Sequence, residues 1–236
     1  MTSKIEEARK AYSANDVALS IQAHDTLVHK EMHKTEGGYL KSAIYGGFDG
    51  IITIFAIVAG AHGSDLGAAV VIILGISGAF GDGLSMGLGD YLSTKSELEF
   101  NATERRREEW EVENNPEGEI KEMIDIYYEK GIPLEDAKTV TSILSKHKKA
   151  WVDIMMIEEL GIIEGDDSPV KNGLVTFISF LLFGFIPLLP YLVSYIFKIG
   201  EQSNWVFIIS LVFTGFSLFL MGAIKTKLTN GNIWKS

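Results

Sequence analysis

The chain has 236 residues, no cysteine, and 31 acidic against 21 basic side chains, for a formal charge of −10. The lack of cysteine excludes a disulfide scaffold, thiolate zinc sites, iron–sulfur clusters and a cysteine nucleophile. An acidic chain repels phosphate, so no nucleic-acid partner is expected. Mean hydropathy is mildly positive (+0.17) although 22% of the residues are charged, so apolar and charged residues must occupy separate segments.

The first 38 residues form a polar segment without the apolar core of a signal peptide, so no cleavable signal peptide is expected. Within this segment His29 and His33 are spaced by four residues. A solvated helix face explains that spacing more simply than metal binding does. We assign these histidines no role.

Four apolar runs are long enough to cross a bilayer, which takes about 20 residues. They cover residues 42–61, 66–92, 173–197 and 205–224. The last two contain no charged residue. The sequence therefore predicts an all-α polytopic membrane protein, with spans 1 and 2 inside residues 39–94 and spans 3 and 4 inside residues 169–224. Lysine and arginine gather on one side of these spans, so the positive-inside rule predicts that both chain ends, including a tail over 225–236, are cytoplasmic.

The segment between spans 2 and 3, residues 95–168, carries the excess of negative charge. From Lys95 to Asp167 there are 20 acidic and 10 basic residues. Helix-forming residues predict that span 2 continues as one helix to Asn115, because Pro116 follows. Further helices are predicted over 117–130 and 134–160. The prediction is a cytoplasmic three-helix domain that is tied to the membrane at both ends.

Carboxylates inside the membrane are costly and point to function. Asp49 lies in span 1 among Gly46, Gly47 and Gly50, and small neighbours of this kind predict a close homodimer seam beside the carboxylate. In span 2, Asp82, Met86 and Asp90 repeat every four residues and share a helix face. Carboxylate oxygen next to thioether sulfur suits a transition-metal ion better than Mg²⁺ or Ca²⁺, although packing alone also explains Met86.

Acidic side chains of the cytoplasmic domain recur at helical spacing. Glu104, Glu108 and Glu111 share one helix face, and Glu119 and Glu122 share another. Like charges at these spacings repel, so either the run 105–107 of arginines or a bound cation should compensate them. Two methionines, Met155 and Met156, stand next to Glu158 and Glu159. A solvated acidic face and a metal site both remain open on spacing alone.

Several motifs in order resemble the vacuolar iron transporter family, which includes plant and protist vacuolar iron transporters and the yeast vacuolar iron importer. These motifs are FDGIITIFAIVAG, SMGLGDYLSTKSE, ERRREEWE, MMIEELG and GAIKTKLT. The resemblance implies a homodimer that exchanges cytosolic Fe²⁺ for organellar protons, with the pathway at the dimer interface and a cytoplasmic domain that collects the metal. It implies a multi-pass protein of a vacuolar or other acidic endomembrane, or of the inner membrane if bacterial.

The resemblance also implies roles for individual residues. Asp49 and Met86 fall at the family's transport positions. Its metal-domain ligands fall at Glu108, Glu111, Glu119, Glu122, Met155, Met156 and Glu159. Fe²⁺ is the expected substrate, with Mn²⁺ as a second candidate, and Co²⁺ and Zn²⁺ should also bind by the usual affinity order.

The sequence departs from the family in two places. Plant members carry a glutamate where this chain has Gly78, and Asp82, one turn further on, is the candidate replacement. The family has five spans, whereas four are predicted here, so the chain is either a truncated member or a four-span variant.

Two other classes of function compete with transport. A di-iron oxidase needs Glu-x-x-His pairs, but Leu144 stands three residues before His147 in the acidic segment, so an enzyme is not expected. A membrane-bound metal scaffold or sensor that binds iron without moving it stays as the alternative.

Overall fold

The computed structural model describes residues 14, 16, 17, 36–163, 165, 167–199 and 204–229. The chain divides into two compact units, Met1–Glu36 and Gly37–Ser236. Most of the predicted N-terminal segment, with His29 and His33, lies outside the described residues, as does the end of the predicted tail. The elements below belong to the second unit, apart from the first residue of α3.

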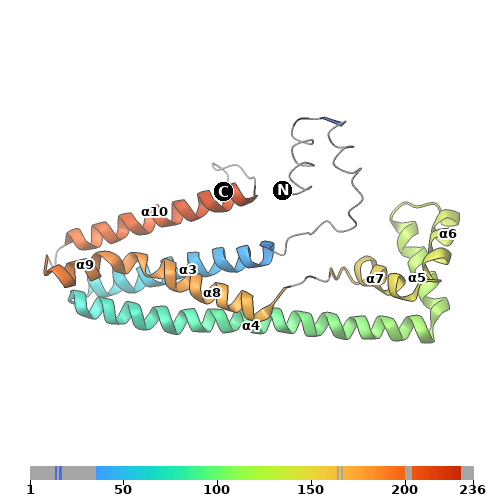
Figure 1. The fold of residues 1–236 in the computed structure, drawn as a ribbon, viewed down its shortest axis with the longest axis horizontal. Helices are drawn as coiled ribbons and strands as arrows, with labels where there is room; N and C mark the ends of the chain where they lie inside the picture. The colour runs from blue at the N-terminus through green and yellow to red at the C-terminus, as the bar shows by residue number, and fades with distance from the viewer. Residues whose placement is uncertain are drawn as a thin grey trace, which may run out of the picture. The chain divides into compact units, whose positions relative to one another are not determined.

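Four helical segments are long and apolar enough to cross a membrane (Figure 1). They are α3 (Glu36–Gly63), α4 (Ala68–Asn114), the pair α8 (Pro169–Gly184) and α9 (Leu189–Phe197), and α10 (Asn204–Thr229). The part of the chain that the structure describes contains helices and no strands. The predicted all-α, four-span architecture is confirmed.

The third span is interrupted between α8 and α9 by a short 3₁₀ helix, η1 (Ile186–Leu188). Pro187 and Pro190 explain the interruption, since proline has no backbone N–H and its ring clashes with the preceding turn. The carbonyl oxygen of Pro187 accepts a hydrogen bond of 2.7 Å from the Ser210 hydroxyl of α10. Span 4 thus supplies a partner at the break in span 3, as buried backbone in a membrane requires.

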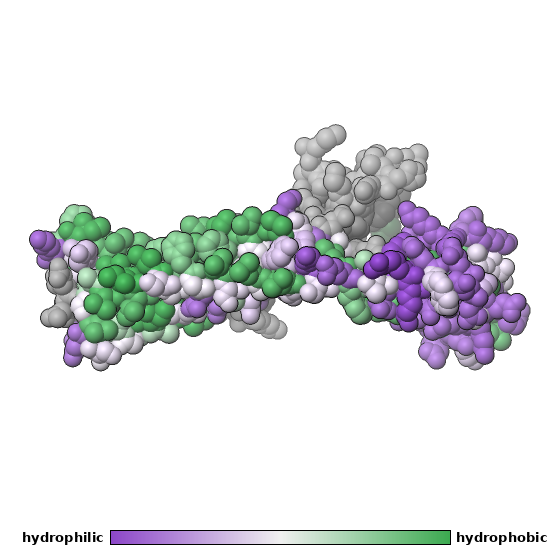
Figure 2. All heavy atoms as spheres, turned by 90° about the horizontal axis from the view of Figure 1, so that it is seen from below, coloured by the Kyte–Doolittle hydropathy of each residue, from purple (hydrophilic) through white to green (hydrophobic). Residues whose placement is uncertain are grey.

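Helix α4 is continuous over 47 residues and extends from the apolar span into the acidic segment. Figure 2 shows the change in character, from a largely hydrophobic surface over the membrane helices to a hydrophilic surface over the helices that follow. The helix ends at Asn114 and Pro116 opens α5 (Pro116–Glu129), so the predicted continuation and its end are both confirmed.

The predicted single helix over 134–160 is wrong, because the structure has two helices there. They are α6 (Leu134–Leu144) and α7 (Lys148–Glu158), separated at residues 145–147. The reason is packing: α6 lies against α5, whereas α7 lies against α4. One straight helix could not bury Ala137 and Thr141 of α6 and Trp151 and Met155 of α7 against these different partners.

The predicted homodimer seam at Gly46, Gly47 and Gly50 is also wrong. A Cβ atom on Gly46 or Gly50 would lie 2.4 Å from the carbonyl oxygen of Thr176 or Phe180, respectively. A Cβ on Gly47 would meet Met221 of α10 at 2.6 Å. These glycines therefore permit close packing of α3 on α8 and α10 inside one chain, and they are buried there.

Candidate metal centre

Three buried or half-buried glutamates meet in the acidic part of the chain. Glu108 of α4, Glu119 of α5 and Glu159, directly after α7, each place a carboxylate oxygen within 4.8 Å of the others. Glu108 is fully buried and Glu119 is 5% exposed. The structure thus brings together three of the predicted ligands from three separate helices. We call these three residues the glutamate cluster.

The apolar core of this region positions the glutamate cluster. Val112, Met123 and Met155 are buried together with Trp151, Val152 and Met156. Each of the first three stands four residues from a cluster glutamate, so each glutamate lies one helical turn from a core residue and on the same face. Burying the core therefore draws three carboxylates to one point.

The electrostatics of the glutamate cluster are unfavourable without a cation. Burial, reinforced by neighbouring glutamates, raises the pKa of Glu108 and of Glu159 to about 7. Burial also raises the pKa of Glu119. The Oε2 atoms of Glu108 and Glu159 are buried and have no hydrogen-bond partner. Buried, unpartnered carboxylate oxygens are costly, and a bound divalent ion would remove that cost.

Arg107 supplies part of the positive charge that the like-charged glutamates of α4 require. Its guanidinium lies 3.0 Å from Glu108 Oε1, 3.2 Å from Glu104 Oε2 and 3.9 Å from Glu111 Oε2. One oxygen of Glu108 is thus paired with arginine, whereas the other is buried without a hydrogen-bond partner. One positive charge cannot balance all of these carboxylates, so the site retains a negative charge.

The remaining predicted ligands of this domain are two glutamates and two methionines. Glu111 and Glu122 are close enough that their charges help to raise the pKa of Glu119. Met155 and Met156 are almost fully buried in the apolar core, which accounts for their burial without a metal. Their ligand role stays a prediction.

The predicted pathway residues of the membrane spans lie apart from this cluster. Met86 is half-buried and lines a cavity of about 460 Å³ between α3, α4 and α8. Asp49 is half-buried and continues the α3 face of Ser42 and Tyr45, one turn beyond the cavity lining. Asp82 is exposed on α4 and does not line the cavity. The structure therefore does not gather Asp49, Asp82 and Met86 at one point of a single chain.

The same cavity is lined by polar residues that the predicted site leaves out. Asp90 accepts a hydrogen bond of 2.7 Å from Ser42 and another from Thr176, which joins three spans. The four-residue repeat with Met86 placed Asp90 on the correct face, so the sequence held a signal for it. No pattern marks Asn172, whose buried side chain reaches the cavity only through the packing of α8 on α4.

Comparison with known proteins gives this geometry a context. The family model described as the VIT family matches residues 40–236. The vacuolar iron transporter of Toxoplasma gondii is 40% identical over 98% of this chain and 81% of its own length. That of Plasmodium falciparum is 40% identical over 98% and 87%. Vacuolar iron transporter 1 of Arabidopsis thaliana is 35% identical over 88% and 81%.

The chain belongs to the VIT family. The matched residues of this VIT-family member contain the whole glutamate cluster, Arg107, and both Met86 and Asp90 of the membrane cavity. The match to the family model therefore includes both the glutamate cluster and the membrane cavity.

Proposed function

We propose that this protein moves Fe²⁺ out of the cytosol, across a vacuolar or other acidic endomembrane, in exchange for protons. The observation that carries the proposal is the glutamate cluster with its unpartnered buried oxygens. Its Glu108 lies on the continuation of a helix that is long and apolar enough to span a membrane. The names of the related vacuolar iron transporters supply the metal and the compartment.

The glutamate cluster captures the ion on the cytosolic side in this proposal. Three carboxylates from three helices can hold one divalent ion, with Glu111 and Glu122 adding negative potential around it. Oxygen ligands alone discriminate poorly among Fe²⁺, Mn²⁺, Co²⁺ and Zn²⁺, and Co²⁺ and Zn²⁺ bind at least as tightly by the usual order. Selectivity for Fe²⁺ must then come from ion availability and from geometry, while the Met86 thioether disfavours the harder Mn²⁺.

Proton exchange follows from the chemistry of carboxylate ligands. A carboxylate must lose its proton to bind a metal ion, so an acidic lumen displaces the ion that the cytosol loads. Asp49, a carboxylate in the middle of span 1, is the residue that we assign to this exchange. Met86 is a ligand without a proton, and Asp82 is the candidate for the acid that is absent at Gly78.

The direct test is Fe²⁺ uptake by sealed proteoliposomes that contain the full-length protein. Uptake should depend on an acidic interior and should collapse when a protonophore removes the gradient. Control vesicles without the protein measure the background leak of Fe²⁺. Saturable Fe²⁺ binding without any uptake, in either direction of the gradient, would favour the alternative of a metal scaffold or sensor.

A homodimer is part of the proposal, and we place its interface on α4 instead of α3. Small residues recur every four positions on the exposed face of α4, at Ser77, Gly81, Ser85, Gly89 and Ser93. The last three also line the cavity between α3, α4 and α8, so the seam would border that cavity. A Cβ atom on Gly81 or Gly89 would meet nothing within 4 Å. Figure 2 shows a pale band through the hydrophobic surface on the side where α4 lies. Small-residue repeats favour close helix pairing in membranes, so a second copy fits here.

Gly81→Leu together with Gly89→Leu should therefore weaken the dimer, because the leucine side chains would hold the two α4 helices apart. Light scattering or cross-linking in lipid nanodiscs measures the oligomeric state. Gly215→Leu, at an open and exposed position on α10, is the matched control and should leave the dimer intact. A double variant that dimerises like the parent protein would rule out this seam.

A further inference from the structure

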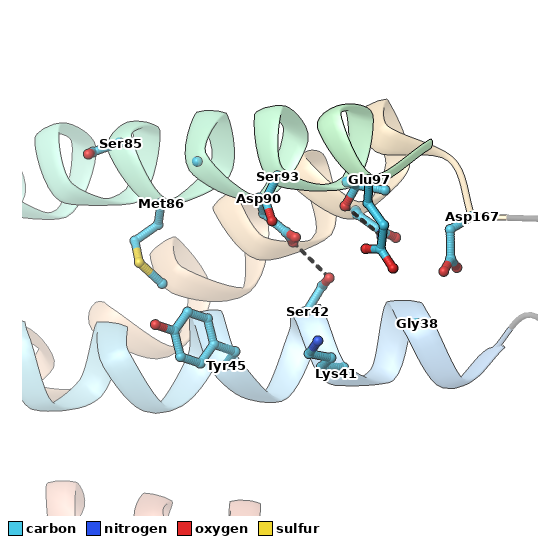
Figure 3. A pocket seen from close by; sticks show the side chains of 13 residues that line it. Gly38, Lys41, Ser42, Tyr45, Ser85, Met86, Asp90, Ser93, Glu97 and Asp167 are labelled. Atoms are coloured by element: carbon cyan, nitrogen blue, oxygen red, sulfur yellow. Dashed lines mark hydrogen bonds between the residues drawn. The ribbon is translucent and has the colours of Figure 1, made fainter. Parts of the chain in front are cut away.

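The cavity between α3, α4 and α8 contains more than the pathway prediction explains. Three carboxylate residues line it, Asp90, Glu97 and Asp167, against one basic residue, Lys41. Figure 3 shows Asp90 pointing from α4 toward Ser42 of α3, with Met86 further along the same side. The charges of these lining residues sum to −2, which favours a cation over an anion.

A second, independent feature of the cavity points to a ligand. Asn172 of α8 is 6% exposed, and its side-chain carbonyl oxygen, Oδ1, has no hydrogen-bond partner. Its amide nitrogen donates to Thr94 Oγ1 at 3.3 Å, so only the oxygen is left over. A buried carbonyl oxygen without a donor is costly, and a cation in the cavity would satisfy it.

The size of the cavity suits a hydrated ion. Six waters occupy about 180 Å³ at roughly 30 Å³ each, and the cavity offers about 460 Å³. A divalent ion can therefore bind with most of its water shell and use protein oxygens for the rest. Asp90 keeps one carboxylate oxygen for this role, because the hydroxyls of Ser42 and Thr176 both donate to its Oδ2.

The position of the cavity relative to the glutamate cluster indicates a role for the cavity in transport. Glu97, Glu104 and Glu108 are spaced by seven and four residues and share one face of α4. At about 1.5 Å per residue, Glu108 lies roughly 16 Å along the helix from Glu97, and Asp90 roughly 10 Å beyond it. Carboxylate side chains thus follow one face of a single helix from the glutamate cluster to the cavity.

We propose that this cavity is a second, separate divalent-cation site, formed by Asp90, Glu97 and the Asn172 carbonyl. It holds the ion, still largely hydrated, between the glutamate cluster and Met86, which lines the same cavity one helical turn beyond Asp90. Asp49 follows one turn beyond the cavity lining on α3. The inference rests on the proposed function, since a site between capture and translocation matters only if the ion is moved.

Binding of Mn²⁺ to the full-length protein in lipid nanodiscs, followed by electron paramagnetic resonance, tests the site. Replacing Glu108, Glu119 and Glu159 by glutamine removes the glutamate cluster and should leave a residual Mn²⁺ site. In that background Glu97→Gln and Asp90→Asn should each weaken the residual site by at least the roughly 10- to 100-fold that losing even an outer-shell partner costs. Glu99→Gln, two residues away and paired with Lys95, should leave it unchanged.

Asn172→Asp keeps the shape of the side chain and adds a charge, so it should tighten Mn²⁺ binding. This gain does not depend on whether Asp90→Asn disturbs the hydrogen bonds among the three spans. No residual Mn²⁺ site, or one that none of these three substitutions alters, would overturn the proposal. Fe²⁺ uptake by the unmodified protein is measured separately, so its absence would contradict the proposed transport and not the second site.

Discussion

Replacing Glu108, Glu119 and Glu159 by glutamine in the full-length protein is expected to abolish its tightest divalent-metal binding. Glutamine keeps the size of each side chain but removes the negative charges that meet within 4.8 Å. The cost of losing these ligands should exceed the roughly 10- to 100-fold typical of an outer-shell change. Titration calorimetry with Co²⁺ or Mn²⁺ measures the effect. Glu135→Gln, on an exposed residue of α6 that pairs with Lys138, is the control.

The same titration should depend steeply on pH. Because the pKa values of Glu108 and Glu159 are raised to about 7, both carboxylates take up protons as the pH falls through 7. Protons then compete with the metal, and each such carboxylate costs about tenfold in affinity per pH unit below its pKa. Between pH 7.5 and pH 6 the affinity should fall by roughly 10- to 100-fold. Affinity that is constant over this range would contradict a cluster built on these two residues.

The stability of the metal-free protein should change with pH in the opposite direction to the metal affinity. Glu108 has a pKa of about 7 in the folded state against 4.5 as its ordinary value, so between these values the folded state binds more protons than the unfolded state. The free energy of unfolding should therefore rise as the pH falls from about 8 to about 6. Divalent metal should stabilise the protein at pH 8 instead. The triple glutamine variant should lose both effects in thermal unfolding.

Fe²⁺ uptake driven by a pH gradient is expected to disappear in Asp49→Asn. The substitution keeps the size of the side chain and a carbonyl ligand, but it removes the charge and the site for a proton. Since only a carboxylate can exchange a proton for a metal ion, the loss should be nearly complete. Asp65→Asn, in the exposed turn after α3, is the matched control and should transport normally. A fully active Asp49→Asn would refute the assigned exchange site.

Met86 and Asp82 separate two further roles in the same vesicle assay. Met86→Leu keeps the apolar volume and removes the sulfur, so it should slow Fe²⁺ more than Mn²⁺ and leave proton coupling intact. Asp82 is exposed on α4 beside the proposed dimer seam. If Asp82 supplies the acid absent at Gly78, Asp82→Asn should impair uptake nearly as much as Asp49→Asn. Normal uptake in Asp82→Asn would remove only that replacement hypothesis.

The sequence alone determined the membrane architecture of this protein and the composition of its acidic domain. Run length and charge identify four spans, because a bilayer demands about 20 apolar residues whatever their partners are. The continuation of α4 beyond the membrane was equally predictable, since no proline or glycine occurs from Tyr91 to Asn115 and Pro116 ends the helix. Glu108, Glu119 and Glu159 could be named as candidate ligands in advance, through helical spacing and through the resemblance of their motifs.

Only the tertiary structure decided which of these residues meet and which surfaces remain free. Gly46 and Gly50 read as a seam in the sequence, but whether a small residue faces its own chain or another copy depends on where α8 packs. The break between α6 and α7 likewise follows from two different packing partners. Asn172 became visible only when α8 lay against α4, because an unpartnered carbonyl oxygen is a property of its surroundings and leaves no trace in local spacing.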